Sequence, residues 1–382
     1  MEKYKTVRLG DVISKADIMR NKSQNYPILS MTMHEGLIFQ KDRFSKQIAS
    51  IDRSNYLVVK RNQLVQSFPI DEGVLDINRI SDFGIVSPAY KIWNIDENKI
   101  YGEYLVKALR CEKSLSFYKQ KLRGTTARRR TITDADFLGM KIPLPPLAEQ
   151  KHIASVLDKC TELIAKHREM LAKYDTLVKS QFVEMFGDIE LSPQKKDWIE
   201  LKDVTKIFTG TTPSTADEEN WNGEILWITP AEMTADSFII YDTQRKITEK
   251  GRLSKSLDIM PVGTVLLSTR APIGKTGIVG TPMTCNQGFK NFLCDSDKLN
   301  SIYLYTLLRN NTVFLNSKGS GTTFKEVSKS VVEKIKIPVP PLELQNDFAA
   351  FVRAVDAQKA KAQQSLDKAE TLYKAMMQEY FG

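Results

Sequence analysis

The sequence predicts an α/β protein made of two similar halves, each an α/β domain followed by one long helix. A segment of 47 residues occurs twice, 195 residues apart: it begins KIPLPPLAEQ and ends EMFG over 141–187, and begins KIPVPPLELQ and ends EYFG over 336–382. Neither copy has Gly or Pro after its proline pair until the last residue, which favours a helix, and short β-branched runs lie between the copies. A register kept without a gap over this length indicates duplicated domains rather than a solenoid of short repeats.

The chain divides into four segments. Residues 1–140 are predicted to form a first α/β domain, 141–190 a first long helix, 191–335 a second α/β domain and 336–382 a second long helix. Within the domains, alternating or β-branched runs bounded by turn residues predict strands, and apolar runs at helical spacing predict short helices. The predicted strands are Tyr56–Lys60, Gly84–Val86, Glu224–Ile228 and Gly263–Leu267, and the predicted helices are Tyr101–Leu109 and Ile302–Leu308.

Each long helix begins at a proline pair, Pro145–Pro146 or Pro340–Pro341, which ends the preceding strand and leads into the first helical turn. Apolar residues then recur at alternating spacings of three and four, a heptad-like stripe wider than a strict coiled-coil seam. A helix of this length spans roughly 55 Å and needs a partner along it. We therefore expect the two copies to pack antiparallel, in the manner of a coiled coil, and to end at Gly187 and Gly382.

The positive charge is unevenly distributed along the chain. The net charge is +9; residues 1–140 have 24 Lys and Arg against 16 Asp and Glu, or +8, and residues 191–335 have 18 against 16, or +2. The two repeated segments, 141–190 and 336–382, together have 13 against 14, or −1. A polyanionic partner would therefore bind the α/β domains, mainly the first. The alternative is a basic surface that contacts only solvent.

The composition excludes several classes of protein. A hydrophobic content of 42% and a charged content of 26% are ordinary for a soluble globular protein. The chain has no apolar run long enough to cross a bilayer and no N-terminal signal peptide, so we expect no membrane association. The four cysteines are scattered, without CxxC spacing, which indicates reduced thiols in the cytoplasm and argues against structural zinc.

The densest basic cluster is the segment 119–130, KQKLRGTTARRR, which places Lys, Arg and small hydroxyl residues around a glycine. Residues of these types bind phosphates and reach base edges. The segment 318–325, KGSGTTFK, has the same Gly-Thr-Thr core with less charge. Because the element occurs twice, we expect both copies to contact a nucleic acid; the alternative is a pair of flexible, solvated loops. The expected contacts are Lys119, Lys121, Arg123, Thr125, Thr126, Arg128, Arg129 and Arg130 in the first domain, and Lys318, Thr322, Thr323 and Lys325 in the second.

Two further sites in the second domain are predicted to contact DNA. The loop RAPIGKTG at 270–277 is not a nucleotide-binding P-loop, because Thr269 stands where that motif requires a glycine. We expect it instead to present Arg270 and Lys275. Asn286 and Gln287 follow a predicted strand and carry amides of the type that pair with adenine. Capping of a turn is the alternative role for this pair.

The motifs of catalysis are missing from the sequence. The three histidines, His34, His152 and His167, form no cluster, and neither a glycine-rich cofactor loop nor the Asn-Pro-Pro-aromatic motif of an adenine methyltransferase occurs. Glu97-Asn-Lys99 has the form of half a nuclease motif, but tripeptides of this kind are common. We therefore predict that the chain is not an enzyme and that it binds no metal or cofactor itself.

Over its whole length the chain resembles the specificity subunit of type I restriction-modification enzymes. The two Pro-Pro-Leu turns carry the resemblance, in Pro145-Pro146-Leu147-Ala-Glu149-Gln150 and Pro340-Pro341-Leu342-Glu-Leu-Gln345. The domains add Gly84-Ile-Val-Ser87-Pro88-Ala-Tyr90, Arg270-Ala-Pro-Ile-Gly274 and Asn286-Gln287-Gly288. Leu344 departs from the family pattern, which usually has a glutamate there, as at Glu149. This departure puts the cap of the second helix, or a subunit contact, in doubt.

The resemblance implies a DNA-binding subunit without catalytic activity. Each α/β domain would be a target recognition domain that reads one half of a bipartite sequence in double-stranded DNA, and the two helices would set the gap between the halves. The helices would also dock two modification subunits, which carry S-adenosylmethionine and methylate one adenine in each half-site. Restriction subunits, which use ATP and Mg²⁺, would join for cleavage. The docking residues that the resemblance implies are Pro145, Pro146, Leu147, Gln150, Pro340, Pro341, Leu342 and Gln345.

Three alternative functions are left open. The chain would be a recognition subunit used for methylation or phage defence without a nuclease partner, a nuclease or methyltransferase of an unfamiliar type, or a coiled-coil scaffold with no role on DNA. Activity of the purified chain alone on DNA would favour the enzyme. The positive charge outside the long helices speaks against the scaffold.

Overall fold

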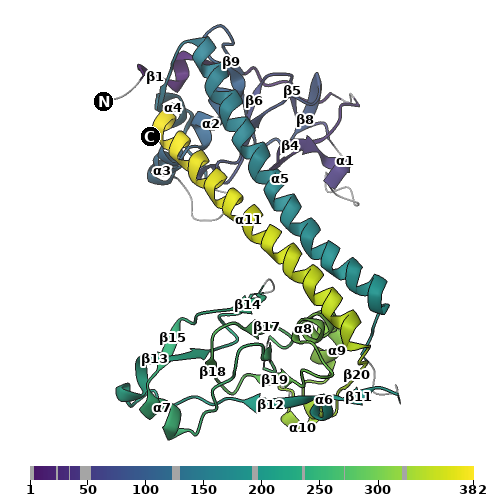
Figure 1. Cartoon of the computed structure of the whole chain (residues 1–382). Helices are drawn as coiled ribbons and strands as arrows, with labels where there is room; N and C mark the ends of the chain where they lie inside the picture. Colours follow the sequence, from purple (N-terminus) through teal and green to yellow (C-terminus); the bar gives the residue numbers. More distant parts are fainter. Residues whose placement is uncertain are drawn as a thin grey trace. The chain divides into compact units, whose positions relative to one another are not determined.

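The chain forms two compact units, each with one α/β domain and parts of both long helices (Figure 1). Unit 1 comprises Met1–Arg168 and Gln364–Gly382, and unit 2 comprises Glu169–Gln363. The computed structural model describes residues 4–22, 25–33, 35–43, 53–122, 130–191, 197–234, 237–270, 272–320 and 325–382.

The sheet of unit 1 has the strand order β2-β9-β6-β7, with neighbouring strands antiparallel. Its strands are β2 (Ile13–Lys15), β9 (Lys91–Ile95), β6 (Leu64–Gln66) and β7 (Leu75–Ile77). Two more antiparallel pairs accompany the sheet: β3 (Leu29–Thr32) with β4 (Gly36–Phe39), and β5 (Leu57–Lys60) with β8 (Phe83–Val86). The first strand, β1 (Thr6–Arg8), pairs with β10 (Lys141–Pro143), which leads into the long helix. The beginning of the domain is thereby joined to its end.

The helices of unit 1 cover an apolar core. The amphipathic helix α2 (Gly102–Arg110) buries Tyr104, Leu105 and Leu109 in the core that also contains Trp93 of β9. The side chain of Thr133 caps α4 by accepting a hydrogen bond from the backbone N–H of Asp136. The other helices and short 3₁₀ turns among the described residues are η1 (Leu9–Asp11), α1 (Gln40–Arg43), η2 (Ile70–Glu72), α3 (Glu112–Lys121) and α4 (Asp134–Gly139).

Unit 2 repeats this plan and extends it. Its main sheet has the order β12-β19-β16-β17-β14, in which the first four strands correspond in order to those of unit 1, and a second sheet has the order β15-β13-β18. As in unit 1, a strand pair, β11 (Ile199–Glu200) with β20 (Lys336–Ile337), joins the beginning of the domain to its end. The remaining strands are β12 (Thr205–Thr209), β13 (Trp221–Ile228), β14 (Ile239–Ile240), β15 (Arg245–Ile247), β16 (Val265–Leu267), β17 (Thr276–Val279), β18 (Met283–Cys285) and β19 (Lys290–Cys294).

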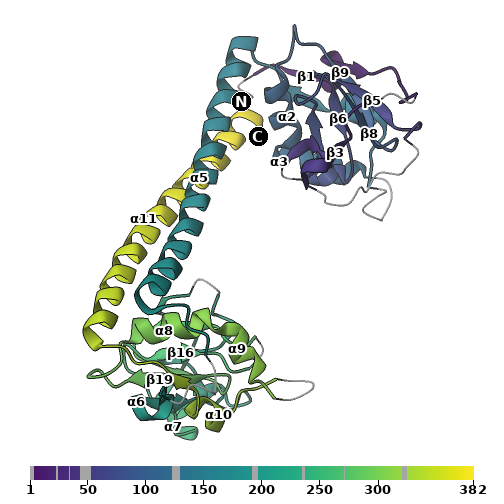
Figure 2. The same ribbon diagram turned by 90° about the vertical axis from the view of Figure 1, so that its right-hand side faces the viewer.

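The helix α8 (Ser301–Asn310) is the counterpart of α2 and is almost entirely buried. It packs against β16 and β17. Figure 2 shows α8 beside β16. The side chain of Asn300 caps its N-terminus by accepting a hydrogen bond from the backbone N–H of Ile302. The other helices described in unit 2 are α6 (Leu201–Val204), η4 (Glu218–Asn220), α7 (Glu249–Ser254), α9 (Thr312–Ser317) and α10 (Lys329–Glu333).

The long helices α5 (Leu147–Phe186) and α11 (Leu342–Phe381) run without a break, as their lack of Gly and Pro predicts. In unit 1 they are antiparallel, because Cys160 contacts Met376 and Arg168 contacts Glu370, so that the numbering rises on one helix as it falls on the other. In unit 2 the same holds for Asp175 with Lys359, at 2.8 Å, and for Phe182 with Phe348. The predicted antiparallel pairing is therefore confirmed.

The fold class is also confirmed, and the predicted elements are found. The runs predicted as strands correspond to β5, β8, β13 and β16, although β16 begins at Val265, two residues later than expected. The predicted short helices are α2 and α8. The pairing of β1 with β10 joins residues more than 130 positions apart, and no local pattern indicated it.

Candidate nucleic-acid interface

Three residues of unit 2 that were predicted to contact DNA, Arg270, Asn286 and Gln287, lie at one edge of its main sheet, and unit 1 has a corresponding edge. In unit 1 this edge is where β6 ends and β9 begins, since Gln66 lies opposite Lys91. In unit 2 it is where β12 and β16 end and β19 begins, since Thr209 lies opposite Lys290 and Ser268 opposite Phe289. The four residues before β9 are Ser-Pro-Ala-Tyr (87–90), and the four before β19 are Asn-Gln-Gly-Phe (286–289). The same position therefore carries different side chains in the two units.

The basic cluster of unit 1 is described only at its two ends. Lys119 and Lys121 are exposed on the last turn of α3, and the Lys121 ammonium lies 3.8 Å from the Asp136 carboxylate. Arg130 is half-buried at the other end. The five remaining predicted contacts lie outside the described residues: Arg123, Thr125, Thr126, Arg128 and Arg129.

Arg130 is held by the domain itself. Its guanidinium donates to the carboxylate of Asp71 at 2.7 Å and to that of Glu72 at 2.5 Å, both in η2. Asp71 is only 6% exposed, and its Oδ1 has no hydrogen-bond partner among the described residues. A guanidinium shared by two carboxylates has little attraction left for a phosphate. The charge of Arg130 is therefore neutralised within its own domain.

A second set of charges fixes the chain just after Arg130. The ammonium of Lys91, the first residue of β9, donates to the carbonyl oxygen of Ile132 at 2.9 Å and pairs with Asp134 at 2.7 Å. Lys15 pairs with the other oxygen of Asp134 at 2.6 Å. Partial burial would raise the pKa of Asp134, but hydrogen bonds from the two lysines outweigh it and hold this pKa below its usual value. The Asp134 carboxylate is therefore ionised. Through Lys15 and Lys91 it links β2 and β9 to the segment that follows Arg130.

The corresponding loop of unit 2 is closed by backbone pairing. Ser320 and Glu326 exchange two backbone hydrogen bonds of 3.0 Å each. The Glu326 carboxylate accepts a hydrogen bond from Arg270 at 2.9 Å and lies 3.5 Å from the Lys290 ammonium. Lys325 is exposed, and Lys318 lies with its ammonium 4.8 Å from the centre of the Phe314 ring. Thr322 and Thr323, also predicted contacts, lie outside the described residues.

Lys275 does not point where the sequence suggested. The loop at 270–277 was expected to present it to a ligand, but its ammonium donates to the carbonyl oxygens of Pro230 and Met233 inside unit 2. The reason is tertiary: β17 begins beside the turn that follows β13, whose carbonyl oxygens need donors. Lys275 therefore fixes the turn at 229–233.

Asn286 caps a turn, which is the alternative role considered for the pair Asn286 and Gln287. The Asn286 carbonyl accepts a hydrogen bond from the backbone N–H of Gly288 at 2.9 Å, which caps the turn before β19. The Gln287 side-chain carbonyl accepts one from the Thr212 hydroxyl at 2.7 Å. The side-chain nitrogens of both residues have no partner among the described residues, and an adenine edge could accept hydrogen bonds from them.

A loop that we did not predict, 210–214, lies beside this amide pair. Its carbonyl oxygens at Thr211 and Ser214 accept hydrogen bonds of 3.1 Å from the indoles of Trp227 and Trp221. Gly210 lies so close to the end of β18 that a Cβ there would be 2.0 Å from the Cys285 carbonyl oxygen. These contacts hold the loop 210–214 in place at the sheet edge that precedes β19. The loop has the sequence Gly-Thr-Thr-Pro-Ser, and its Gly-Thr-Thr also occurs in the predicted segments 119–130 and 318–325. This repeat was a signal from which the loop could have been predicted.

The predicted docking residues lie where each domain meets its long helix. The glutamines of the two turns, Gln150 and Gln345, are fully buried and bond only within their own units among the described residues. Pro146 and Pro341 are exposed, whereas Leu147 and Leu342 are half-buried. The remaining two, Pro145 and Pro340, offer their carbonyl oxygens to the glutamines.

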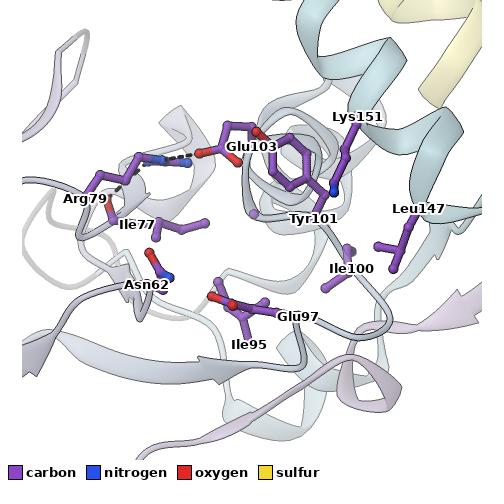
Figure 3. Close-up of a pocket in the computed structure, with 11 residues that line it drawn as sticks. Asn62, Ile77, Arg79, Ile95, Glu97, Ile100, Tyr101, Glu103, Leu147 and Lys151 are labelled. Atoms are coloured by element: carbon purple, nitrogen blue, oxygen red, sulfur yellow. Dashed lines mark hydrogen bonds and ion pairs between the residues drawn. The ribbon is translucent and has the colours of Figure 1, made fainter.

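A cavity of about 380 Å³ in unit 1 lies at the same corner (Figure 3). On one side Arg79 pairs with Glu103 at 2.6 Å, and on the other Leu147 and Lys151 project from α5. The Lys151 ammonium lies 5.9 Å from the centre of the Tyr101 ring. The cavity therefore combines an internally paired guanidinium with the first turn of the long helix.

The residues that the structure describes hold neither a metal-binding cluster nor a membrane-spanning helix. They contain no group of three or more His, Cys, Asp or Glu side chains arranged to hold a metal ion. No helix among them has the length and apolarity needed to cross a membrane. All four cysteines are free thiols.

A family model matches most of the chain. The family model described as the type I restriction modification DNA specificity domain matches residues 1–173 and 193–371. The chain belongs to this family. The two matched ranges each contain one α/β domain and most of the helix that follows it, so the duplication seen in the sequence is a duplication of the specificity domain.

Individual members of the specificity family are similar over different lengths. The MjaIX specificity subunit of Methanocaldococcus jannaschii is 36% identical over 200 residues, which cover 50% of this chain and 46% of that protein. The chain thus matches less than half the length of this relative. The MjaVIII specificity subunit of the same organism is 25% identical over 406 residues, covering 97% of this chain and 90% of that protein.

Solved structures show that the fold is shared over the whole chain. The S subunit of a type I restriction-modification system from M. genitalium has a TM-score of 0.60 at 13% identity, covering 100% of this chain and 96% of that one. A chain from a structural study of assembly and conformational transition in the type I system has a TM-score of 0.57 at 19% identity, covering 99% and 97%. At these identities the likeness concerns the fold alone.

Proposed function

We propose that this specificity-family chain binds double-stranded DNA and reads a bipartite sequence, one half-site with each α/β domain, without catalysing a reaction itself. The observation that carries the proposal is the shared sheet edge with different side chains. The edge holds Ser-Pro-Ala-Tyr (87–90) in unit 1 and Asn-Gln-Gly-Phe (286–289) in unit 2. Two domains that share a fold but carry different side chains at the same sheet edge can recognise two different half-site sequences.

The two kinds of DNA contact are supported by different residues. Exposed lysines at the rim, such as Lys119, Lys121 and Lys325, suit phosphates, which position the protein without reading sequence. The amides of Asn286 and Gln287 are held by the turn before β19 and by Thr212, and they suit base edges. The net charge of +8 in residues 1–140 favours stronger and more salt-dependent phosphate binding by the first domain.

The corners where the domains meet the long helices support a docking role for partner proteins. We infer that two modification subunits, which carry S-adenosylmethionine, bind there and methylate one adenine in each half-site. Restriction subunits that use ATP and Mg²⁺ join them for cleavage. The exposed Pro146 and Pro341 and the cavity beside Leu147 offer surface for these partners, whereas the buried glutamines stabilise the corners from inside. The free thiols fit a reducing cytoplasm.

The proposal is tested by mapping N6-methyladenine in host DNA with single-molecule sequencing, with the gene present and deleted. We expect deletion to abolish methylation at one two-part motif, which would identify both half-sites and the gap. If methylation is unchanged and the purified chain binds no duplex, the proposal fails. Methylation or cleavage by the purified chain alone would instead identify an enzyme. Pull-down of the modification subunit with the tagged chain tests the docking role separately.

A further inference from the structure

A groove of about 580 Å³ in unit 1, the α3–α11 groove, lies between α3 and the last turns of α11. Figures 1 and 2 show the end of α11, marked C, beside α3. The lining of the groove has four cationic side chains, Arg110, Lys113, Lys119 and Lys374, and one acidic side chain, Glu112. The three lysines are exposed. A concave surface with this excess of positive charge attracts anions.

The charge of the groove is not neutralised by the domain. Arg110 donates to two uncharged carbonyl oxygens, that of Gly73 at 3.2 Å and that of Leu75 at 2.6 Å. Lys113 donates to a main-chain oxygen of Gly382 at 3.2 Å. None of the three exposed lysines pairs with a side-chain carboxylate among the described residues. Four cations against one carboxylate leave the lining with an excess of three positive charges.

The groove adjoins the sheet edge that we propose as the interface of unit 1. Lys119 belongs both to the groove and to the last turn of α3, where the basic segment 119–130 begins. The helix α3 packs against η2, which follows shortly after β6 ends at Gln66. A polyanion bound at this edge can therefore extend along α3 into the groove, which favours a long polyanion over a small anion.

The corresponding part of unit 2 lacks this charge. The helix α9, which follows α8 as α3 follows α2, has the sequence TVFLNS and no charged residue. Lys374 has a counterpart 195 residues earlier, Lys179, but that lysine lines a cavity together with the carboxyl groups of Asp175 and Asp356. The groove therefore accounts for part of the difference in net charge between the two α/β domains, +8 against +2.

We propose that the α3–α11 groove binds the phosphate backbone of duplex DNA through Lys113 and Lys374, outside the bases that unit 1 reads. The proposal rests on the proposed function, since it extends the DNA-binding surface of unit 1. It brings a long helix into contact with DNA, although the net charge of −1 in the repeated segments favoured the α/β domains alone. Ammonium groups bind phosphates as point charges and read no base, so the groove adds affinity without specificity.

The test uses the full chain with its modification subunits and two duplexes, one with the mapped motif and one with a single half-site scrambled. The variants are Lys113→Gln, Lys374→Gln, their double variant and Lys374→Arg, which keeps the charge. Fluorescence anisotropy over a salt series gives the affinity for each duplex and the slope of its logarithm against the logarithm of salt concentration. Thermal melting verifies that each variant is folded, and size-exclusion chromatography verifies that it keeps its modification subunits.

We expect each single Lys→Gln variant to lower the magnitude of the salt slope by about 0.9, and the double variant to lower it by about 1.8. Between about 50 and 200 mM salt, the affinity advantage of the unsubstituted complex over a single variant should therefore shrink about 3.5-fold. The ratio of the affinities for the two duplexes should not change, because phosphate contacts carry no sequence information. Lys374→Arg should keep the slope. The matched control is Lys159→Gln, at an exposed position of α5 in unit 1, which should also keep it.

Two results would overturn the proposal. The first is an unchanged salt slope for the double variant, or an equal decrease for Lys159→Gln, which would show an effect of net charge alone. The second is loss of the modification subunits from the variants, which would assign the groove to an acidic protein surface instead of DNA. Failure of the unsubstituted complex to bind either duplex would contradict the proposed function, so the failures of the two proposals are distinguishable.

Discussion

Gln150 and Gln345 make the same three hydrogen bonds, each within its own unit. Gln150 accepts from the backbone N–H of Tyr101 at 2.8 Å and donates to the carbonyl oxygens of Lys99 and Pro145. Gln345 accepts from the N–H of Asn300 at 2.9 Å and donates to those of Lys298 and Pro340. Both side chains are fully buried. The first turn of each long helix is thereby fastened to the start of α2 or α8.

Replacing either glutamine by leucine should destabilise its unit strongly. Gln150→Leu or Gln345→Leu leaves three backbone groups, most of them partly buried, without their side-chain partner, and we expect the free energy of unfolding to fall by about 3 kcal/mol. Urea denaturation followed by circular dichroism measures the change. Gln358→Leu, at an exposed position of α11, is the control and should change stability by less than about 0.5 kcal/mol. Equal effects at the buried and exposed sites would contradict the role of these bonds.

The last aromatic residue of each long helix completes the core of a unit. Phe381 packs on Tyr104 in unit 1, with ring centres 5.2 Å apart, and Phe186 packs on Tyr303 in unit 2, at 4.9 Å. We expect Phe381→Ala to cost about 3–5 kcal/mol, because the side chain is 2% exposed and its removal leaves a cavity. The midpoint of urea unfolding checks this. Leu372→Ala, 53% exposed on the same helix, should have a far smaller effect.

At neutral pH, unit 2 should be less stable with Asp356 than with an uncharged residue at the same position. Burial raises its pKa in the folded state, and the nearby Lys359 only partly opposes this. A carboxyl group whose folded pKa exceeds its unfolded pKa binds protons more tightly when folded, so its ionised form disfavours folding. Asp356→Asn should therefore raise the melting temperature at pH 7. The gain should shrink as the pH falls through the folded pKa, where Asp356 itself becomes protonated.

The control for this prediction is Asp297→Asn, at an exposed position of unit 2. Asp297→Asn should leave the melting temperature nearly unchanged both at pH 7 and at a pH below the folded pKa of Asp356. A stabilisation by Asp356→Asn that is equally large at low pH would show that side-chain charge is not the cause.

Arg128 and Arg129 should behave differently from Arg130. Changing both to alanine removes two charges from the basic segment, and we expect weaker binding to every duplex, whatever its sequence. The slope of log affinity against log salt should fall by roughly 1.8, because about 0.9 is lost per phosphate contact. Lys22→Ala and Lys60→Ala together remove the same charge from exposed positions elsewhere in the first domain and serve as the control. Unchanged binding to all duplexes would remove this segment from the DNA interface.

The periodic features of the molecule could be predicted from the sequence, because their causes are local. The duplicated segments, the proline pairs and the uninterrupted apolar stripe predict two long helices, and α5 and α11 have those bounds. The residues that pair across long distances in the sequence could not be predicted. The Gly-Thr-Thr at 210–212 was visible in the sequence, but its place beside Gln287 depends on Trp221 and Trp227, which are held by another sheet.

The two like halves, the two long helices and the positive excess confined to the α/β domains could all be predicted from the amino-acid sequence. Which of the charged side chains are free to bind a partner depends on contacts between distant parts of the chain. Arg130 meets Asp71 across 59 positions of chain, Arg270 meets Glu326 across 56, and Lys275 turns inward to carbonyl oxygens. The physical reason is that helix and strand propensities act between near neighbours, whereas a charge is neutralised by whatever group folding brings within a few ångströms of it.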